Sequence, residues 1–549
     1  MKQKILFFFY LTVLILPNMI LCITENMPIR GKVVLVLLPL GVYWTILGAF
    51  PKISKTLWAM FPVLFLGAFN IVLTYLFGRG VIAVDMWLNL TTSSPDEMGE
   101  MLSQIFPAVV AVVMIYLPTL IYATYDLNKA TILPLAFRGK QKKIGLALTA
   151  LSLPMMLGIN NWNIKDDLFP VNVCYNLKLA IKRQHLSEKY LEGSKDFIFH
   201  AKACDTDSIA KVVVLVIGET GRACNWQLYG YDRETTTLLA NTENLLVYTD
   251  CMSQSNTTHK SVPILLSPAT AENYEILYRS KGLLAAYNEA GYHTVFISNQ
   301  PRNKSFNDHL GEQAKEVLFL RDYSGETPFD IQLLPKIAKT LEKNTGNMLL
   351  VIHTYGSHST YHDRYEEAYA HFTPHVAPRP TKKYRETLVN AYDNTIRYTD
   401  ITLNELISYL KKDSRAVAML YTSDHGEDIY DDKRNLFLHA SPWPSYYQLH
   451  VPMLVWTNET YRRLYNERVT LMEDRTTEPI QTDCIFPTIL GLGGIETPYG
   501  QDSLALTSTE YQTKQNRTYL SDHNEALPFN RCLDMKDIMQ MKLRGLRTY

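Results

Sequence analysis

Carboxylate and imidazole side chains directly follow apolar stretches in the C-terminal two thirds of this sequence. Glu219 comes after the apolar run VVVLVIG, and Asp424 and His425 come after AVAMLYTS. A buried carboxylate is costly unless a cation compensates it, and carboxylate with imidazole is a donor set that suits Zn²⁺ or a similar ion. Because Asp424 and His425 are adjacent, both reach one ion only from a turn, which Gly426 can supply. These residues predict a metal site.

A hydroxyl beside such an ion would lose its proton more easily, which favours a Ser or Thr nucleophile. The segment SQSNTTHKSVP at 253–263 offers several hydroxyls, and further histidines occur in GSHSTYHDRY and LFLHASPWP. Each feature alone has a simpler explanation. An Asp-His-Gly turn is often surface structure, a single histidine often belongs to a loop, and Glu219 could cap the next helix. Their coincidence after predicted strands favours one shared site.

The elements that would position these residues alternate between short apolar strands and helical patterns. Helical patterns occur, for example, at 280–290 and 387–411. The predicted strands are 212–217, 294–298, 348–353, 416–422 and 451–456. This alternation predicts a mostly parallel α/β sheet with both faces covered. In such sheets ligands bind beyond the carboxyl ends of the strands, so the polar residues should gather at one edge.

The N-terminal third contains apolar runs without charged residues, and about 20 such residues cross a bilayer as a helix. Basic residues gather in alternate loops, which places the N-terminus in the cytoplasm and everything after residue 159 outside. The first run could instead be a cleaved signal peptide, but Leu21 stands before Cys22 where lipoprotein cleavage needs a small residue. Five membrane helices are therefore expected. The runs are 5–22, 33–50, 57–78, 105–125 and 144–159.

Three regions follow from these patterns: a transmembrane domain at 1–160, a connector at 161–211 and an external catalytic domain at 212–549. The connector segment NLKLAIKRQHLSEKYLEG could lie along the membrane surface or be an ordinary linker helix. Six of the seven cysteines fall in the external part, and the sequence does not choose among their fifteen pairings. Lys plus Arg and Asp plus Glu both number 54, which argues against nucleic acid as the main partner.

Several motifs occur together in a specific order: VIGETGR, LYGYDRETT, TTHKSVP, YDNTIRYTD, SDHGED, LHA and QLHVPML. Through these motifs the sequence resembles the lipid A and lipopolysaccharide phosphoethanolamine transferases, which belong to the alkaline phosphatase and sulfatase superfamily. The resemblance covers nearly the whole chain. It implies five membrane helices followed by an external α/β domain of the alkaline-phosphatase and sulfatase type, with a mostly parallel central sheet.

The resemblance also implies roles for the residues found above. Glu219, Asp424 and His425 would hold a zinc ion, and Thr258 would be the nucleophile and fourth ligand. Two further histidines would bind the phosphoethanolamine phosphate or a second zinc ion; they are His358 and His439.

Further positions match those by which the family binds its lipid donor. In SNQPRNK, Gln300 and Lys304 correspond to donor-binding residues, with Asn299 as a rival for the first position. Three polar residues recur every four residues in NLTTSSPDE, so one helical face would carry them. In the family this face contacts the donor headgroup; the alternative is that the segment is a polar external loop. The three residues are Asn89, Ser93 and Glu97.

The implied activity moves phosphoethanolamine from phosphatidylethanolamine, through a threonine-linked intermediate, to lipid A or a lipopolysaccharide core sugar. The protein would be a monomer in the bacterial inner membrane, in contact with membrane lipid and with its catalytic domain in the periplasm. One alternative is a phosphoglycerol transferase of the lipoteichoic-acid or periplasmic-glucan type, and another is a non-catalytic membrane-anchored binding protein. A formylglycine sulfatase is disfavoured because SVPIL at 261–265 lacks the required arginine.

Overall fold

The structure is a computed structural model that describes residues 2–25, 27–77, 82–92, 95–129, 132–159, 162–205, 208–321 and 328–549. The chain divides into two compact units, one of apolar N-terminal helices up to Lys182 and one from Arg183 onward, with Asp432–Phe437 grouped with the first unit. The dividing point falls inside a helix, and the predicted limits 1–160, 161–211 and 212–549 stay predictions.

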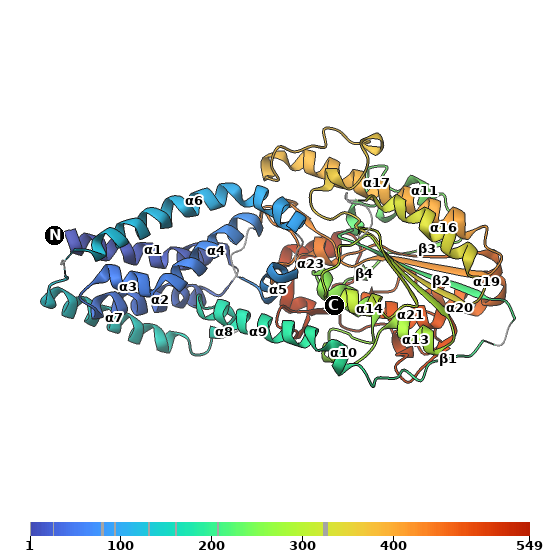
Figure 1. The fold of residues 1–549 in the computed structure, drawn as a ribbon, viewed down its shortest axis with the longest axis horizontal. Coiled ribbons are helices and arrows are strands. Elements are labelled where there is room, and N and C mark those ends of the chain that lie inside the picture. The colour runs from blue at the N-terminus through green and yellow to red at the C-terminus, as the bar shows by residue number, and fades with distance from the viewer. Residues whose placement is uncertain are drawn as a thin grey trace. The chain divides into compact units, whose positions relative to one another are not determined.

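The first unit consists of helices (Figure 1). Up to Met155 they are α1 (Lys2–Thr24), α2 (Ile29–Ala49), α3 (Ile53–Ala59), α4 (Phe61–Phe77), α5 (Val84–Thr92), α6 (Pro95–Leu127) and α7 (Leu135–Met155). Among the described residues, three helical stretches are long and apolar enough to cross a membrane: Lys2–Thr24, Ile29–Ala49 and Ile105–Leu127. The pair α3 and α4, bent by 62°, would add a fourth if it forms one span.

The predicted count of five membrane helices is therefore not confirmed. The fifth apolar run lies in α7, whose first half carries four basic residues that shorten its apolar length: Arg138, Lys140, Lys142 and Lys143. Even so, α7 packs closely along α2. A Cβ atom added at Gly41 of α2 would lie only 2.7 Å from the backbone nitrogen of Thr149 in α7. Small residues of this kind let the backbones of membrane helices approach each other.

The connector is helical up to Gly193, and β1 (Lys202–Ala203) follows. It contains α8 (Ile164–Asp167), α9 (Val171–Glu188) and α10 (Tyr190–Gly193). The basic and apolar segment at 176–193 therefore lies in α9 and α10, and its placement along a membrane surface stays a prediction.

A central sheet organises the second unit. Within the described residues it has seven strands in the order β3-β11-β8-β2-β7-β5-β6. Their bounds are β2 (Lys211–Gly218), β3 (Leu245–Tyr248), β5 (His293–Ser298), β6 (Glu316–Phe319), β7 (Met348–His353), β8 (Ala416–Ser423) and β11 (Met453–Thr457). The strands from β8 to β6 run parallel. The predicted strand at 451–456, observed as β11, instead runs antiparallel to both neighbours, so the sheet is mixed.

Helices cover both faces of this sheet (Figure 1). The strand β2 is buried along its whole length, as its continuous apolar run requires. Val213, Leu215 and Ile217 belong to the core on one face, which also contains residues of α13 (Leu283–Glu289) and α21 (Ile485–Leu492). Val216 faces the other layer, which α16 (Leu334–Lys343) and α17 (Arg385–Leu410) form.

Candidate active site

The ends of β2 and β8 bring the first site residues together. The two strands are parallel neighbours, and Gly218, the last residue of β2, is in register with Ser423, the last residue of β8. Glu219 and Asp424 therefore leave the sheet side by side at its carboxyl edge. The backbone nitrogen of Asp424 also donates to the carbonyl oxygen of Gly218, which fixes the two strand ends to each other.

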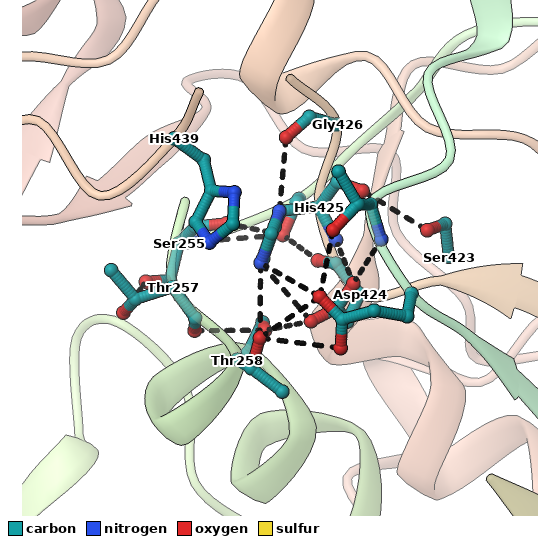
Figure 2. A network of polar contacts seen from close by, with 12 residues as sticks. Ser255, Thr257, Thr258, Ser423, Asp424, His425, Gly426 and His439 are labelled. Carbon is teal, nitrogen blue, oxygen red and sulfur yellow. Dashed lines mark hydrogen bonds and ion pairs between the residues drawn. The ribbon is translucent and has the colours of Figure 1, made fainter. Parts of the chain in front are cut away.

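Glu219, Asp424 and His425 form a compact set of metal donors. One ligand atom from each residue lies within 4.8 Å of the others. The Nε2 atom of His425 is 3.3 Å from Oδ2 of Asp424 and 3.6 Å from Oε1 of Glu219. Figure 2 shows Asp424 and His425 converging with Thr258. The exposed fractions of the three donors are 2% for Glu219 and 0% for both others, so the set is shielded from water.

The electrostatics of this set calls for a cation. Burial, with the neighbouring Asp424 carboxylate, raises the pKa of Glu219 well above its usual value, because like charges in a dry site oppose each other. Among the ion pairs of the described residues, none joins Glu219 or Asp424 to a lysine or arginine. The Nδ1 atom of His425 lies 2.9 Å from the carbonyl oxygen of Gly426. That carbonyl can only accept, so Nδ1 carries the proton and Nε2 keeps a lone pair for a metal.

The turn after β2 is held in an unusual backbone conformation. Thr220 has a φ of 60°, in the left-handed region that residues with a branched Cβ rarely adopt. Its backbone nitrogen donates to Oδ1 of Asp424 at 3.1 Å, and its hydroxyl donates to Oε1 of Glu219 at 2.7 Å. Thr220 thus orients two carboxylates of the donor set.

Thr258 brings a hydroxyl to the same point. It is the first residue of α12 (Thr258–Leu266). Its Oγ1 atom lies 3.2 Å and 3.3 Å from the two carboxylate oxygens of Glu219 and 3.1 Å from Nε2 of His425. One turn later, Ser261 donates to Oδ2 of Asp424 at 3.3 Å. The start of a helix carries partial positive charge, which favours negative charge developing on this hydroxyl.

His439 stands beside the donor set with a carboxylate behind it. Its ring centroid is 4.2 Å from that of His425. Its Nδ1 atom lies 3.1 Å from Oε1 of Glu427, whose other oxygen accepts from the hydroxyl of Tyr361 at 2.5 Å. Burial lowers the pKa of His439 to about 4 and raises that of Glu427 to about 8. No role was predicted for Glu427 from the sequence, although it lies in SDHGED, two residues after His425.

His358 follows β7 and lies among aromatic and cationic groups. Its ring stacks on Tyr355 with centroids 4.9 Å apart. Burial, together with the positive charge of Arg364, lowers its pKa well below the usual value. The ring is therefore neutral at pH 7 and can accept or donate a hydrogen bond.

The SNQPRNK segment reaches the site through one of its residues. Nε2 of Gln300 lies 3.3 Å from Oε2 of Glu219 and donates to the carbonyl oxygen of Thr354 at 2.8 Å. The rival Asn299 instead donates to the carbonyl oxygen of Pro328 and to Asp330. Lys304 is exposed. The geometry therefore brings Gln300 to the donor set and leaves the side chain of Lys304 facing solvent.

The expected donor-contacting face near the membrane is described only in part. Ser93 lies outside the described residues, as do the side chains of Asn89 and Glu97. Asn89 belongs to α5 and Glu97 to α6, which begins at Pro95. A proline at the first helical position is favourable because its missing N–H would have no partner there. The role of these three residues stays a prediction.

The cysteines take no part in the site. All seven are described, and all are free thiols. None of the seven described cysteines lies in the segment 253–263 around Thr258, and no disulfide brackets the hydroxyl.

Known proteins match this chain across the site. A model of the sulfatase family matches residues 211–495, slightly more than half of the chain. The chain belongs to the sulfatase family. The phosphoethanolamine transferase EptA of Escherichia coli K12 is 33% identical over 302 residues, which are 53% of this chain and 54% of that protein. The aligned part therefore spans about half the length of this curated relative.

Two solved structures extend the comparison for this sulfatase-family chain. The integral membrane phosphoethanolamine transferase EptA of Neisseria meningitidis has a TM-score of 0.69 at 24% identity, over 92% of this chain and 98% of that one. The periplasmic domain of Escherichia coli EptC in complex with Zn has a TM-score of 0.54 at 23% identity, over 62% and 98%. The chain thus has the fold of a membrane domain followed by an alkaline-phosphatase-like domain.

Proposed function

We propose that this protein is a metal-dependent transferase that moves phosphoethanolamine from phosphatidylethanolamine to lipid A or to a lipopolysaccharide core sugar. The observation that carries this proposal is the position of the Thr258 hydroxyl, within 3.3 Å of both Glu219 and His425 at the start of a helix. The relative named EptA, similar over this region, supports the choice of phosphoethanolamine. It favours this reading over a phosphoglycerol transferase.

The metal would be one zinc ion held by Glu219, Asp424 and His425, with Thr258 as the fourth group. Two buried carboxylates without a described cationic partner and an imidazole with a free Nε2 lone pair fit such an ion. When bound, zinc stabilises negative charge on oxygen and so makes a nearby hydroxyl more acidic. A second ion, or the phosphate of the donor, would be bound by His358 and His439.

The residues of the chain account for both steps of the transfer. In the first step, Oγ1 of Thr258 bonds to phosphorus while the bond from phosphorus to the diacylglycerol oxygen breaks. The hydroxyl proton would be lost to solvent when the ion binds, and the departing diacylglycerol oxygen needs a proton in the step itself. His439 can give that proton from Nε2 while its Nδ1 takes one from the Glu427 carboxyl, whose raised pKa of about 8 keeps it protonated at pH 7.

In the second step, an oxygen of the acceptor bonds to phosphorus and Oγ1 of Thr258 leaves. A sugar hydroxyl would give its proton to an imidazole, whereas a phosphate oxygen has none to give. The threonine is regenerated, so the products are diacylglycerol and the modified glycolipid. Donor and acceptor are both lipids, which accounts for an enzyme with membrane helices.

The remaining assignments belong to the same proposal. The protein would reside in the bacterial inner membrane as a monomer, with the catalytic unit in the periplasm. Gln300 and Lys304 would contact the donor, with Gln300 the better placed of the two. Asn89, Ser93 and Glu97 would contact the donor headgroup from the membrane domain.

Mass spectrometry of glycolipids from cells with and without this chain tests the function. We expect a mass increase of one phosphoethanolamine group that requires Thr258 and is absent from cells carrying Thr258→Ala. A matched assay with fluorescent phosphatidylethanolamine and phosphatidylglycerol identifies the donor. Unchanged phosphoethanolamine in the Thr258→Ala cells would overturn the proposal, and turnover of phosphatidylglycerol alone would favour the phosphoglycerol transferase.

A further inference from the structure

The C-terminal helix α23 (Met535–Leu543) has one face that is firmly attached to the catalytic unit. Asp537 and Met541 on this face are both 0% exposed. Oδ1 of Asp537 accepts from the backbone nitrogen of Tyr446 at 2.9 Å, and Met541 belongs to the same apolar cluster as Tyr446 and Leu449. The helix therefore has a fixed orientation, and its opposite face is defined by the fold.

That opposite face is apolar and exposed. The exposed fractions are 77% for Met535, 62% for Met539 and 74% for Leu543. Residues at i, i+4 and i+8 lie along one stripe of a helix. A single exposed apolar side chain is ordinary. Three on one stripe of a short, rigidly held helix form a surface suited to contact with another apolar surface or with lipid.

Basic residues surround the stripe. Lys536 and Lys542 are exposed, and at about 100° of rotation per residue they lie on either side of the stripe. Three exposed arginines continue the positive charge along the same terminal segment: Arg531, Arg544 and Arg547. The two acidic side chains of this segment lie away from the stripe. Asp534 caps the helix, and Asp537 is buried against Tyr446.

The helix also lies near the candidate active site. The backbone nitrogen of Gly426, next to His425, donates to the carbonyl oxygen of Gln448 at 2.7 Å. Gln448 belongs to α18 (Tyr446–Leu449), the short helix on which α23 packs. Trp443, in the loop before α18, is 40% exposed, and tryptophan is enriched where proteins meet the bilayer surface.

We propose that α23 docks on the surface of the membrane that holds the N-terminal helices of the same chain. Met535, Met539 and Leu543 would enter the interfacial layer, and Lys536 and Lys542 would contact anionic headgroups. Three side chains alone bind a bilayer weakly. Here the spans tether the catalytic unit to the membrane, so the high effective concentration makes a weak contact sufficient. This inference needs the membrane helices but does not rest on the proposed reaction.

Photocrosslinking of the full-length protein in nanodiscs of phosphatidylethanolamine and phosphatidylglycerol tests this docking. Position 539 would carry photoreactive p-benzoylphenylalanine in place of Met539. The control would carry it in place of Tyr409, which is 36% exposed and lies at the end of α17, just before β8 begins and so at the opposite edge of the sheet. We expect a phospholipid adduct at 539 at least fivefold above the adduct at 409.

A charge reversal tests the role of the lysines. With the photoreactive group at 539, the double substitution Lys536→Glu and Lys542→Glu should reduce the phospholipid adduct severalfold. The exposed pair Lys411→Glu and Lys412→Glu beside Tyr409 should leave it unchanged. Equal lipid adducts at 539 and 409 would overturn the proposal, as would adducts at 539 only to peptides of the chain's own membrane helices. A failed transfer reaction would not affect either readout.

Discussion

The hydroxyl oxygen of Thr258 lies 3.1 Å from Nε2 of His425, although 167 positions separate the two residues in the chain. Thr258 begins a helix and His425 follows a central strand. Both side chains contact the carboxylate of Glu219, which follows the neighbouring strand. A hydroxyl held among three metal donors is positioned for ionisation, whereas a surface threonine is not.

Substitution of the two threonines should have unequal effects. Thr258→Ala removes the proposed nucleophile, and we expect transfer to fall by at least about 10³-fold with zinc at least partly retained. Thr220→Ala removes only a hydrogen bond to Glu219, so a decrease of about tenfold or less is expected. Turnover of fluorescent phosphatidylethanolamine and zinc content by mass spectrometry measure both effects. Loss of transfer in Thr220→Ala alone would mean that Thr220 is the nucleophile.

Removal of the metal should destabilise the catalytic unit, because it leaves two buried carboxylates uncompensated. At a zinc concentration of 100 times Kd, binding contributes about 2.7 kcal/mol to stability. We expect chelation to lower the Tm of the wild type by several degrees and to have little effect on Glu219→Gln, which binds the ion poorly. Glu316→Gln, at a surface ion pair with Lys343, serves as the control and should respond as the wild type does. An equal response of Glu219→Gln would argue against Glu219 as a ligand.

Gly356 should tolerate no side chain. Its φ is 50°, and a Cβ there would lie 2.6 Å from the backbone oxygen of Glu219. Gly356→Ala should therefore lower the free energy of unfolding by about 2 kcal/mol or more and reduce zinc binding by displacing Glu219. Gly346 has nothing within 4 Å of such a Cβ, so Gly346→Ala is the matched control. Denaturant unfolding and zinc content measure both effects. The Gly346→Ala control should match the wild type in both, and Gly356→Ala should not.

Acid should weaken the fold in part through His450. Burial lowers its pKa from 6.5 to about 4. Its Nε2 atom faces the carbonyl oxygen of Thr249, so Nδ1 must accept from the hydroxyl of Tyr446 at 2.8 Å. Because the folded-state pKa is depressed, the contribution is complete above pH 6.5 and is lost as the pH falls towards 4. The loss amounts to about 3 kcal/mol.

The variant His450→Gln cannot take up this proton. Its Tm should be lower than that of the wild type at pH 7.5 but should fall less steeply between pH 6.5 and 4. His185→Gln, at an exposed histidine of α9, should keep the slope of the wild type. If His450→Gln has the same slope as the wild type, the His450 ring does not contribute to the acid sensitivity.

The sequence by itself determined the metal-donor residues and the strands that carry them. Strands buried on both faces show as continuous apolar runs, so the ends of β2 and β8 were visible, and with them Glu219, Asp424 and His425. Motif order indicated the family and pointed to Thr258 among several hydroxyls at 253–263. These features depend on neighbouring residues or on composition, so they can be recognised in the sequence without knowledge of the fold.

Only the tertiary structure decided the direction of β11, the contact partners of Gln300 and Glu427, and the state of the cysteines. The only helix in the fully described segment between β8 and β11 is the four-residue α18, which is too short for a crossover, and the strand returns antiparallel. Gln300 and Glu427 act through residues distant in sequence, namely Glu219 and His439. Contacts of this kind depend on how the layers pack, and no local pattern encodes that distance.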